Sequence, residues 1–398
     1  MDFELTAEQQ SAKDRFREWV DRNIVPVADE HDASEETPPE LIANMASAGF
    51  LGGVISPEYG GGGMDALTWG LLCEQVGRGS ASLLSLLTVH GMVSQVISRW
   101  GSDQQRKKWL PKLASGEVVG AFGLSEPKHG SDAGNIESEA SLQEEGYYLL
   151  NGEKRWISYG MTATLFLIFA KADGKMTAFL VERNMEGFRS EPIRGMLGFR
   201  AAGLARLVLK DIKVPAENVV GKPGFGFSHI ASTALDLGRY CIAWGCTGLS
   251  QAALDAALDY SGERKQFGKQ LNEHQLIQEM LSDMIVNTKA ARLMCYHAAF
   301  LKESGEPSML LETSAVKYYT SRVAVSSANS AIQIHGANGF SSDYPVQRYY
   351  RDAKIMEVIE GSSQIQQIII ARSGYQQHLV EKRDRAAKVN TSVTSDPQ

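Results

Sequence analysis

Residues 351–372 read RDAKIMEVIEGSSQIQQIIIAR, and Glu360 lies at the centre of this stretch. The spacing Ser363-x-x-Gln366 is that of a capping box, which predicts a helix that begins just after Glu360. Apolar residues share one face of that helix with an arginine: Ile365, Ile368, Ile369 and Arg372. The apolar residues before Glu360 would raise its pKa, whereas the positive helix end would lower it. Such a carboxylate can act as a base on a weakly acidic C–H group, and a solvated loop acid is the alternative that these residues leave open.

The composition is that of a soluble globular protein of two or three domains. The chain has 398 residues, 43% of them hydrophobic and 22% charged. A net charge of −7 gives no reason to expect nucleic acid or an anionic membrane as partner. The N-terminus lacks a signal-peptide pattern, and the longest apolar run, 165–170, is far shorter than the roughly 20 residues of a membrane span. Four cysteines without metal-ligand spacing predict core thiols, no metal site and a cytoplasmic setting.

The first 120 residues predict a helical domain. Thr6 and Gln9 form a capping box for a first helix, and further helices are expected over 39–48, 66–99 and 103–115. The glycine-rich turn at 57–63 follows no strand and contains no GKS or GKT, so it matches neither a Walker loop nor a dinucleotide fingerprint.

Residues 121–226 predict a central antiparallel β domain, either a barrel or a sandwich. Asn151-Gly152 after the apolar residues 147–150 indicates one hairpin turn, and Asp173-Gly174 between two apolar runs indicates another. Further strands are expected near 186–194 and 204–213.

Residues 227–385 predict a C-terminal four-helix bundle, with long helices over 227–263, 272–304, 308–336 and 363–382. The polar segment 386–398 is expected to be a disordered tail. The predicted fold class is therefore α+β, mainly α, with the order helical, β, helical.

Several short motifs in the same order resemble those of the acyl-CoA dehydrogenase superfamily, over about residues 6–374. The resemblance rests on the 351–372 stretch and on four further segments: 121–132 (AFGLSEPKHGSD), 154–158 (KRWIS), Arg264 with Phe267 and Gln275, and 333–340 (QIHGANGF). The last segment has Ala337 where a second glycine is common in the family.

The resemblance implies an FAD site in which the β domain contributes one set of residues. The loop of Phe122, Leu124 and Ser125 would run along the flavin ring, and Gly130 and Ser131 would lie near the pyrophosphate and the thioester. Trp156 would stack against the ring, with Ile157 and Ser158 at its N5 edge.

The resemblance also implies that a second subunit completes this site, as a homodimer or homotetramer. The segment with Arg264, Phe267 and Gln275 would reach the neighbour's FAD. Arg264 would bind its pyrophosphate, because a guanidinium matches a phosphate bidentately, and Gln275 would lie near its adenosine half. The remaining cofactor contacts implied by the resemblance are Gln333, Gly336, Gly361, Ser363 and Gln364.

The implied reaction is α,β-dehydrogenation of an acyl thioester. Glu360 would remove the proton next to the carbonyl, while flavin N5 accepts a hydride from the β-carbon. The base in some members lies instead just before Arg239, where this chain has Gly238. The backbone N–H of Glu360 and a ribityl hydroxyl would stabilise the carbonyl oxygen. Besides Glu360, the expected substrate contacts are Ser131, Asp236, Arg239 and Gly361.

The identity of the thioester is left open between coenzyme A and an acyl carrier protein. Residues 198–205 (GFRAAGLA) lack the Ser-x-Thr of many fatty acyl-CoA members. With 243–246 and 358–362, they are similar to the branch that oxidises a glyceryl group on an acyl carrier protein toward a hydroxymalonyl polyketide extender unit. A short- or branched-chain acyl-CoA dehydrogenase with an electron-transfer partner is the competing interpretation. An oxidase of the same fold that reacts with oxygen and a non-catalytic scaffold are further alternatives.

Overall fold

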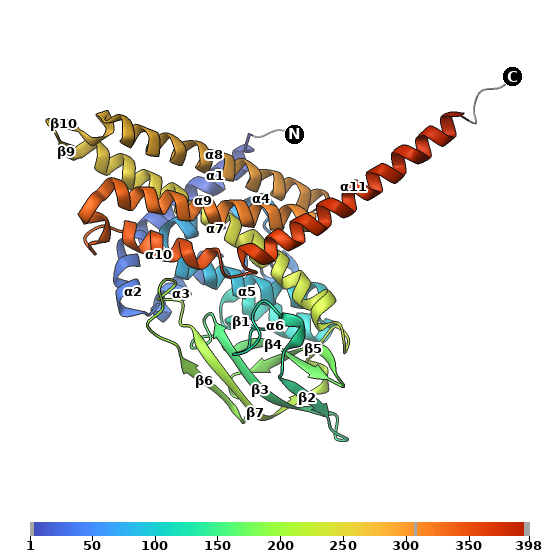
Figure 1. The fold of residues 1–398 in the computed structure, drawn as a ribbon. Helices are drawn as coiled ribbons and strands as arrows, with labels where there is room; N and C mark the ends of the chain where they lie inside the picture. Colours follow the sequence, from blue (N-terminus) through green and yellow to red (C-terminus); the bar gives the residue numbers. More distant parts are fainter. Residues whose placement is uncertain (1–3, 306–308, 394–398) are drawn as a thin grey trace.

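The computed structural model describes residues 4–305 and 309–393. Helices from both ends of the chain pack together, and the middle of the chain forms a β domain on one side of them (Figure 1). The order helical, β, helical confirms the predicted fold class.

The N-terminal domain contains more helices than the sequence pattern indicated. The Thr6 capping box is confirmed, because Thr6 Oγ1 accepts from Gln9 N at 3.2 Å and Gln9 Oε1 accepts from Thr6 N at 3.1 Å. A short second helix was not predicted. The helices of this domain are α1 (Ala7–Asn23), α2 (Ala28–Ser34), α3 (Pro39–Ser47), α4 (Ala66–Gly79), α5 (Ala81–Trp100) and α6 (Asp103–Ser115).

The single helix predicted over 66–99 was wrong, because Ser80 divides it into α4 and α5. Ser80 has extended backbone angles, and its hydroxyl caps α5 by accepting from Leu83 N at 3.4 Å. The helix is interrupted within a stretch of sequence that stays apolar, so the hydrophobic periodicity did not indicate a boundary. Among the described helices, α5 has the length and composition of a membrane span, but 89% of its most apolar window is buried inside the protein, as in a core helix.

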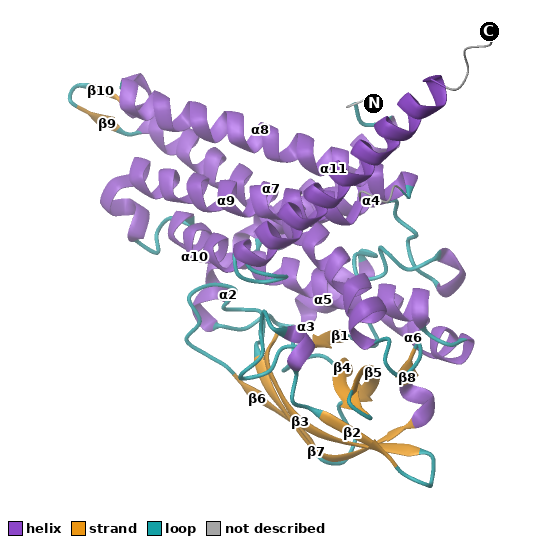
Figure 2. Ribbon diagram, turned by 45° about the vertical axis from the view of Figure 1, so that its right-hand side comes forward, coloured by secondary structure: helices purple, strands orange, loops and turns teal. Residues whose placement is uncertain are grey.

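The β domain is one open sheet rather than the predicted barrel or sandwich (Figure 2). Its strand order is β6-β7-β3-β2-β4-β5-β8, with β1 paired to β4 off this path. Most pairs are antiparallel as predicted, but β1 and β2 both run parallel to β4. The strands are β1 (Gly120–Gly123), β2 (Glu139–Leu142), β3 (Tyr147–Ile157), β4 (Leu165–Ala172), β5 (Lys175–Glu182), β6 (Phe188–Pro192), β7 (Ala205–Pro215) and β8 (Val219–Val220).

One of the two predicted hairpin turns was also wrong. Strand β3 continues through Asn151-Gly152, where its register against β7 shifts between Leu150 and Gly152. A side chain on Gly152 would lie 2.2 Å from the Ser138 hydroxyl, so the glycine permits a close approach rather than a turn. The second hairpin, β4 to β5 around Asp173-Gly174, is confirmed.

The C-terminal domain is built around α7, which contacts α4, α5, α8, α9 and α10. Helix α11 packs against α9, and its later turns project away from the other helices (Figure 1). It continues to Val393, so the tail expected from residue 386 is helical to that point, and 394–398 lie outside the described residues. The remaining elements are α7 (Ser232–Glu263), β9 (Lys265–Gln266), β10 (Lys269–Gln270), α8 (Gln275–Ser304), α9 (Met309–His335), α10 (Val346–Met356) and α11 (Ser363–Val393).

Candidate active site

Glu360 lies in a tight turn between α10 and α11. Its φ is +54° and that of Gly361 is +89°, so two successive residues adopt positive φ angles. Only glycine does this at little cost, so the surrounding contacts must hold Glu360 in this conformation. The predicted capping box does not form as expected. Ile365 N donates to Ser362 Oγ at 3.5 Å, and the Gln366 side chain donates back to the carbonyls of Glu360 and Gly361 at 3.0 Å each.

The Glu360 carboxyl group points at α7 and lies directly over Gly238. A Cβ built on Gly238 would lie 2.2 Å from Glu360 Oε2 and 3.1 Å from the Met92 sulfur of α5. Oε2 is buried and has no hydrogen-bond partner within the part of the chain that the structure describes. Burial raises the pKa of Glu360 from 4.5 to about 7, against the lowering influence of Arg239 and Lys317. The carboxyl is thus poised to exchange a proton near neutral pH.

Arg239 and Asp236 flank this position on α7. Arg239 Nε donates to the Glu360 carbonyl oxygen at 3.3 Å, so it contacts the turn rather than the carboxyl. Asp236 pairs through Oδ2 with Lys302, and its buried Oδ1 has no partner among the described residues.

A buried ion pair fixes the loop that follows β1. Lys154 Nζ donates to Glu126 Oε1 at 2.6 Å and to the Leu124 carbonyl at 3.3 Å. Burial alone would raise the pKa of Glu126, but the Lys154 charge and hydrogen bonds from Lys154 and Ser138 hold that pKa below its usual value. Arg155 N also donates to the Ser125 carbonyl at 2.9 Å. The Leu124-Ser125 backbone is therefore tied to β3 at successive residues.

The structure leaves Trp156 available as a flat binding surface. Its φ is +65°, its side chain is 46% exposed, and the Arg155 guanidinium carbon lies 4.6 Å from the centre of its ring. Arg155 Nε is buried without a hydrogen-bond partner among the described residues. An exposed indole beside an unused donor fits a planar group with acceptor atoms, such as a flavin. Ile157 beside it is buried, and Ser158 is half-buried.

Other predicted residues of the β domain lie on the same side of the site. Phe122 packs against Phe169 with ring centres 5.2 Å apart, and Leu124 belongs to the same buried cluster as Met92. Gly130 and Ser131 lie in the exposed loop that follows.

A second group of predicted residues lies elsewhere in the chain. Arg264 and Phe267 lie at the β9–β10 hairpin, at the outer end of α7 and α8 and away from the sheet (Figures 1 and 2). Phe267 is 95% exposed. The 333–340 segment lies at this same end, because Asn338 Nδ2 donates to the Tyr260 hydroxyl at 3.0 Å. Here Gln275, Gln333 and Gly336 are exposed. One chain thus does not bring this group beside Trp156.

Comparison with known proteins identifies the family and confirms the architecture. Models of the acyl-CoA dehydrogenase N-terminal, middle and C-terminal domains match residues 6–117, 121–212 and 224–375. The chain belongs to the acyl-CoA dehydrogenase family. This is a family of flavin-dependent oxidoreductases that use FAD.

Individual relatives match along nearly the whole chain. A glutaryl-CoA dehydrogenase of Desulfococcus multivorans is 40% identical, covering 93% of this chain and 97% of its own. A short-chain specific acyl-CoA dehydrogenase of Clostridium acetobutylicum is 37% identical, covering 93% and 99%. The solved butyryl-CoA dehydrogenase of Megasphaera elsdenii has a TM-score of 0.90 at 35% identity, covering 94% and 99%.

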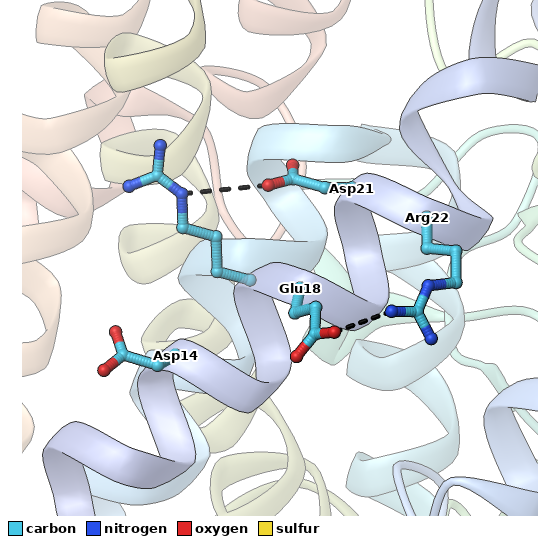
Figure 3. A pocket seen from close by; sticks show the side chains of 5 residues that line it. Asp14, Glu18, Asp21 and Arg22 are labelled. Carbon is cyan, nitrogen blue, oxygen red and sulfur yellow. Dashed lines mark hydrogen bonds and ion pairs between the residues drawn. The ribbon is translucent and has the colours of Figure 1, made fainter.

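A surface hollow on α1 is unrelated to this family site. It is lined by charged side chains that pair with one another, Arg22 with Glu18 at 2.6 Å and Arg17 with Asp21 at 3.8 Å (Figure 3). Exposed pairs of this kind are typical of a solvated helix face.

Sequence reasoning missed two residues that contact the Glu360 turn of the candidate site on the side of α9 and α11. Lys317 on α9 and Gln366 on α11 are both buried and donate to carbonyls of the Glu360 turn. The Glu126–Lys154 pair was within quoted motifs but had no assigned role. A lysine among the apolar residues of a helix was the available signal for Lys317, because lysine is almost never fully buried without a partner.

Proposed function

We propose that Glu360 removes the α-proton of an acyl-CoA thioester, as the first part of an α,β-dehydrogenation. Two observations on the Glu360 carboxyl support this. Its Oε2 is buried without a hydrogen-bond partner among the described residues, and burial raises its pKa to about 7. A base with a pKa near the working pH is ionised in a substantial fraction of the molecules and still holds an abstracted proton effectively. FAD, when bound, supplies the acceptor for the hydride that leaves the β-carbon. Loss of the proton and the hydride leaves a double bond between the two carbons.

The same turn can stabilise the thioester carbonyl as it gains negative charge. The Glu360 N–H has no hydrogen-bond partner within the described residues. We assign it as one donor to the carbonyl oxygen, because a fixed backbone donor needs no reorganisation during the reaction. Gly361 then permits the approach of the substrate, and Ser363 and Gln364 follow in the first turn of α11.

The substrate class follows from the relatives and from the residues of α7. The named relatives act on short-chain acyl-CoA, butyryl-CoA and glutaryl-CoA. Asp236 Oδ1 is a buried acceptor without a partner among the described residues, and it suits an amide N–H of the coenzyme A arm. Arg239 lies beside it on α7 and contacts the Glu360 carbonyl oxygen. We therefore propose coenzyme A as the carrier of a short acyl group, with Ser131 at the thioester end.

The acyl-carrier-protein alternative receives no support from residues 198–205, the first of the three segments that suggested it. Ala201 and Ala202 are buried, and the Ala201 carbonyl accepts from Thr37 Oγ1 at 2.7 Å. These alanines pack between domains, so their identity does not report on the carrier. Oxidation of a hydroxyacyl group on an acyl carrier protein therefore stays an alternative that only substrates can decide.

We further propose a homo-oligomer in which a neighbouring subunit completes the FAD site. Arg264, Phe267 and Gln275 are exposed at one end of the molecule, away from Trp156. An exposed Phe267 beside an exposed guanidinium is a surface suited to the phosphate and adenine parts of a cofactor bound by another subunit. The mass of the holoenzyme in solution distinguishes a dimer from a tetramer. We propose that an electron-transfer partner reoxidises the flavin.

Anaerobic bleaching of the bound flavin tests this function. The holoenzyme is mixed with butyryl-CoA, glutaryl-CoA, longer acyl-CoAs, and butyryl- and glyceryl-loaded acyl carrier protein. Rapid bleaching by a short acyl-CoA supports the proposal. Bleaching only by a loaded carrier protein contradicts it in favour of the alternative, and no bleaching by any thioester contradicts both. Fast reoxidation of the bleached enzyme in air would instead indicate an oxidase.

A further inference from the structure

Three donors from different helices hold the carbonyl groups of the Glu360 turn. Arg239 of α7 donates to the Glu360 carbonyl, and Gln366 of α11 donates to the Glu360 and Gly361 carbonyls. Lys317 of α9 donates to the Gly361 carbonyl at 2.9 Å and, at 3.5 Å, to the Glu357 carbonyl. The left-handed backbone of Glu360 is thus surrounded by side-chain donors.

Lys317 is an unusual group for this task because it is fully buried and forms no ion pair. Its exposed fraction is 0%, and no carboxylate among the described residues lies within ion-pair distance of Nζ. The nearby Glu357 carboxylate pairs with Lys354 instead. A buried charge without a counter-ion is costly, so a role for the charge itself is expected.

The hydrogen bonds of Lys317 are not needed to satisfy the turn. The Gly361 carbonyl also accepts from Gln366 Nε2 at 3.0 Å, and the Glu357 carbonyl also accepts from Ser363 N at 3.0 Å. Removing Lys317 would therefore leave neither carbonyl without a donor. The substitution would, however, remove the positive charge that α9 places behind the turn.

We propose that Lys317 is a positioning residue for the base, whose buried ammonium lies behind the left-handed turn and favours the ionised form of the Glu360 carboxyl. This rests on the proposed role of Glu360. Of the ionisable groups around Lys317, Arg239 on α7 acts in the same direction on Glu360, and Glu357 is paired at the surface. Burial raises the pKa of the Cys246 thiol on α7 to about 12, so it stays neutral. Burial likewise lowers the pKa of Lys317 to about 8, so the lysine keeps its charge at neutral pH.

Infrared titration of the holoenzyme tests this proposal without substrate. The band of the protonated Glu360 carboxyl is assigned by its absence in Glu360→Gln. In Lys317→Met we expect the Glu360 pKa to rise by about 1, because a nearby opposite charge is removed. Lys289→Met, which removes an exposed lysine of α8, should leave that pKa unchanged. An unchanged Glu360 pKa in Lys317→Met would overturn the proposal, and Lys317→Gln serves the same titration if the methionine variant does not fold.

Flavin reduction provides the second readout. The rate of flavin reduction should fall at acidic pH as Glu360 becomes protonated. In Lys317→Met this acid limb of the pH–rate profile should move to higher pH by the same amount as the pKa, so that reduction is about tenfold slower at pH values below the limb. Lys317→Gln restores a donor without charge, so its rate should show the same shift toward higher pH as that of Lys317→Met. Equal slowing at every pH with reduced FAD content would show a purely structural role. If no acyl-CoA reduces the wild-type flavin, the proposed function fails, while the infrared titration still decides the effect of Lys317.

Discussion

Two glutamates with buried carboxyl oxygens and lysines nearby, Glu126 and Glu360, have opposite properties. Both oxygens of Glu126 accept hydrogen bonds, Oε1 from Lys154 and Ser138 and Oε2 from Glu137 N. Its pKa is held below the usual value. Glu360 Oε2 has no partner among the described residues, and its pKa is raised to about 7. Burial is common to both residues, so the number of donors at the carboxyl decides whether the acid is structural or reactive.

The position of the lysine explains the difference. Lys154 donates to the Glu126 carboxylate itself, whereas Lys317 donates to carbonyls of the turn and influences the Glu360 carboxyl only through space. Glu126 therefore fixes the loop beside Trp156, whereas Glu360 keeps an oxygen without a partner among the described residues, as the proposed base requires.

Moving the base between helices should produce the largest effect. We expect Glu360→Gly to slow flavin reduction by butyryl-CoA by about 10²- to 10⁴-fold, the usual contribution of a general base. Adding Gly238→Glu should recover part of this rate, because the Cβ of residue 238 points at the position of the lost carboxyl. Gly238→Glu alone should be poorly active, since its side chain would collide with Glu360. A double variant no faster than Glu360→Gly would show that the two positions are not equivalent.

Removing the structural acid should mainly affect stability. Glu126→Gln leaves Lys154 as an unpaired buried charge, which typically costs about 3–5 kcal/mol in the free energy of unfolding. Equilibrium unfolding in urea, with FAD content, measures the effect. Glu137→Gln is the matched control, because it removes only surface contacts with Lys128 and His129, and exposed pairs of this kind contribute about 1 kcal/mol or less. Equal stability of Glu126→Gln and Glu137→Gln would contradict the role of the Glu126 pair.

The two acids should also give pH dependences of opposite sign. Folding raises the pKa of Glu360, so the stability it contributes is full below about pH 4.5 and is lost as pH rises through 7. Glu360→Gln should therefore be more stable than the wild type above pH 7, and this difference should shrink as pH falls. Folding lowers the pKa of Glu126, so the penalty of Glu126→Gln should shrink as pH falls through its folded pKa. Thermal unfolding of both variants and the wild type across pH measures how each stability difference changes with pH. Changes of the same sign for Glu360→Gln and Glu126→Gln would contradict the distinction between the two acids.

The sequence predicted those features whose signals are local. The Thr6 cap and the β4–β5 turn at Asp173-Gly174 follow from side-chain chemistry and turn geometry over a few residues. The motifs around Trp156 and Glu360 predicted the family, which the comparisons confirm, and the candidate site follows from that resemblance.

The features that the sequence missed depend on distant contacts. Gly152 looked like a turn residue, but it makes room for Ser138 of another segment. Gln366 looked like a helix cap, but its amide reaches back to the carbonyls of the turn. The burial of Lys317 beside those carbonyls depends on how α9 packs against the turn, which no local pattern encodes.

The central claim is that Glu360 is the base, and stopped-flow anaerobic reduction of the flavin by butyryl-CoA tests it most directly. The wild-type rate should rise with pH through an apparent pKa of about 7. Glu360→Gln should retain FAD and be reduced at least about 100-fold more slowly, without that limb. Reduction of Glu360→Gln at the wild-type rate, with the same pH dependence, would contradict the account.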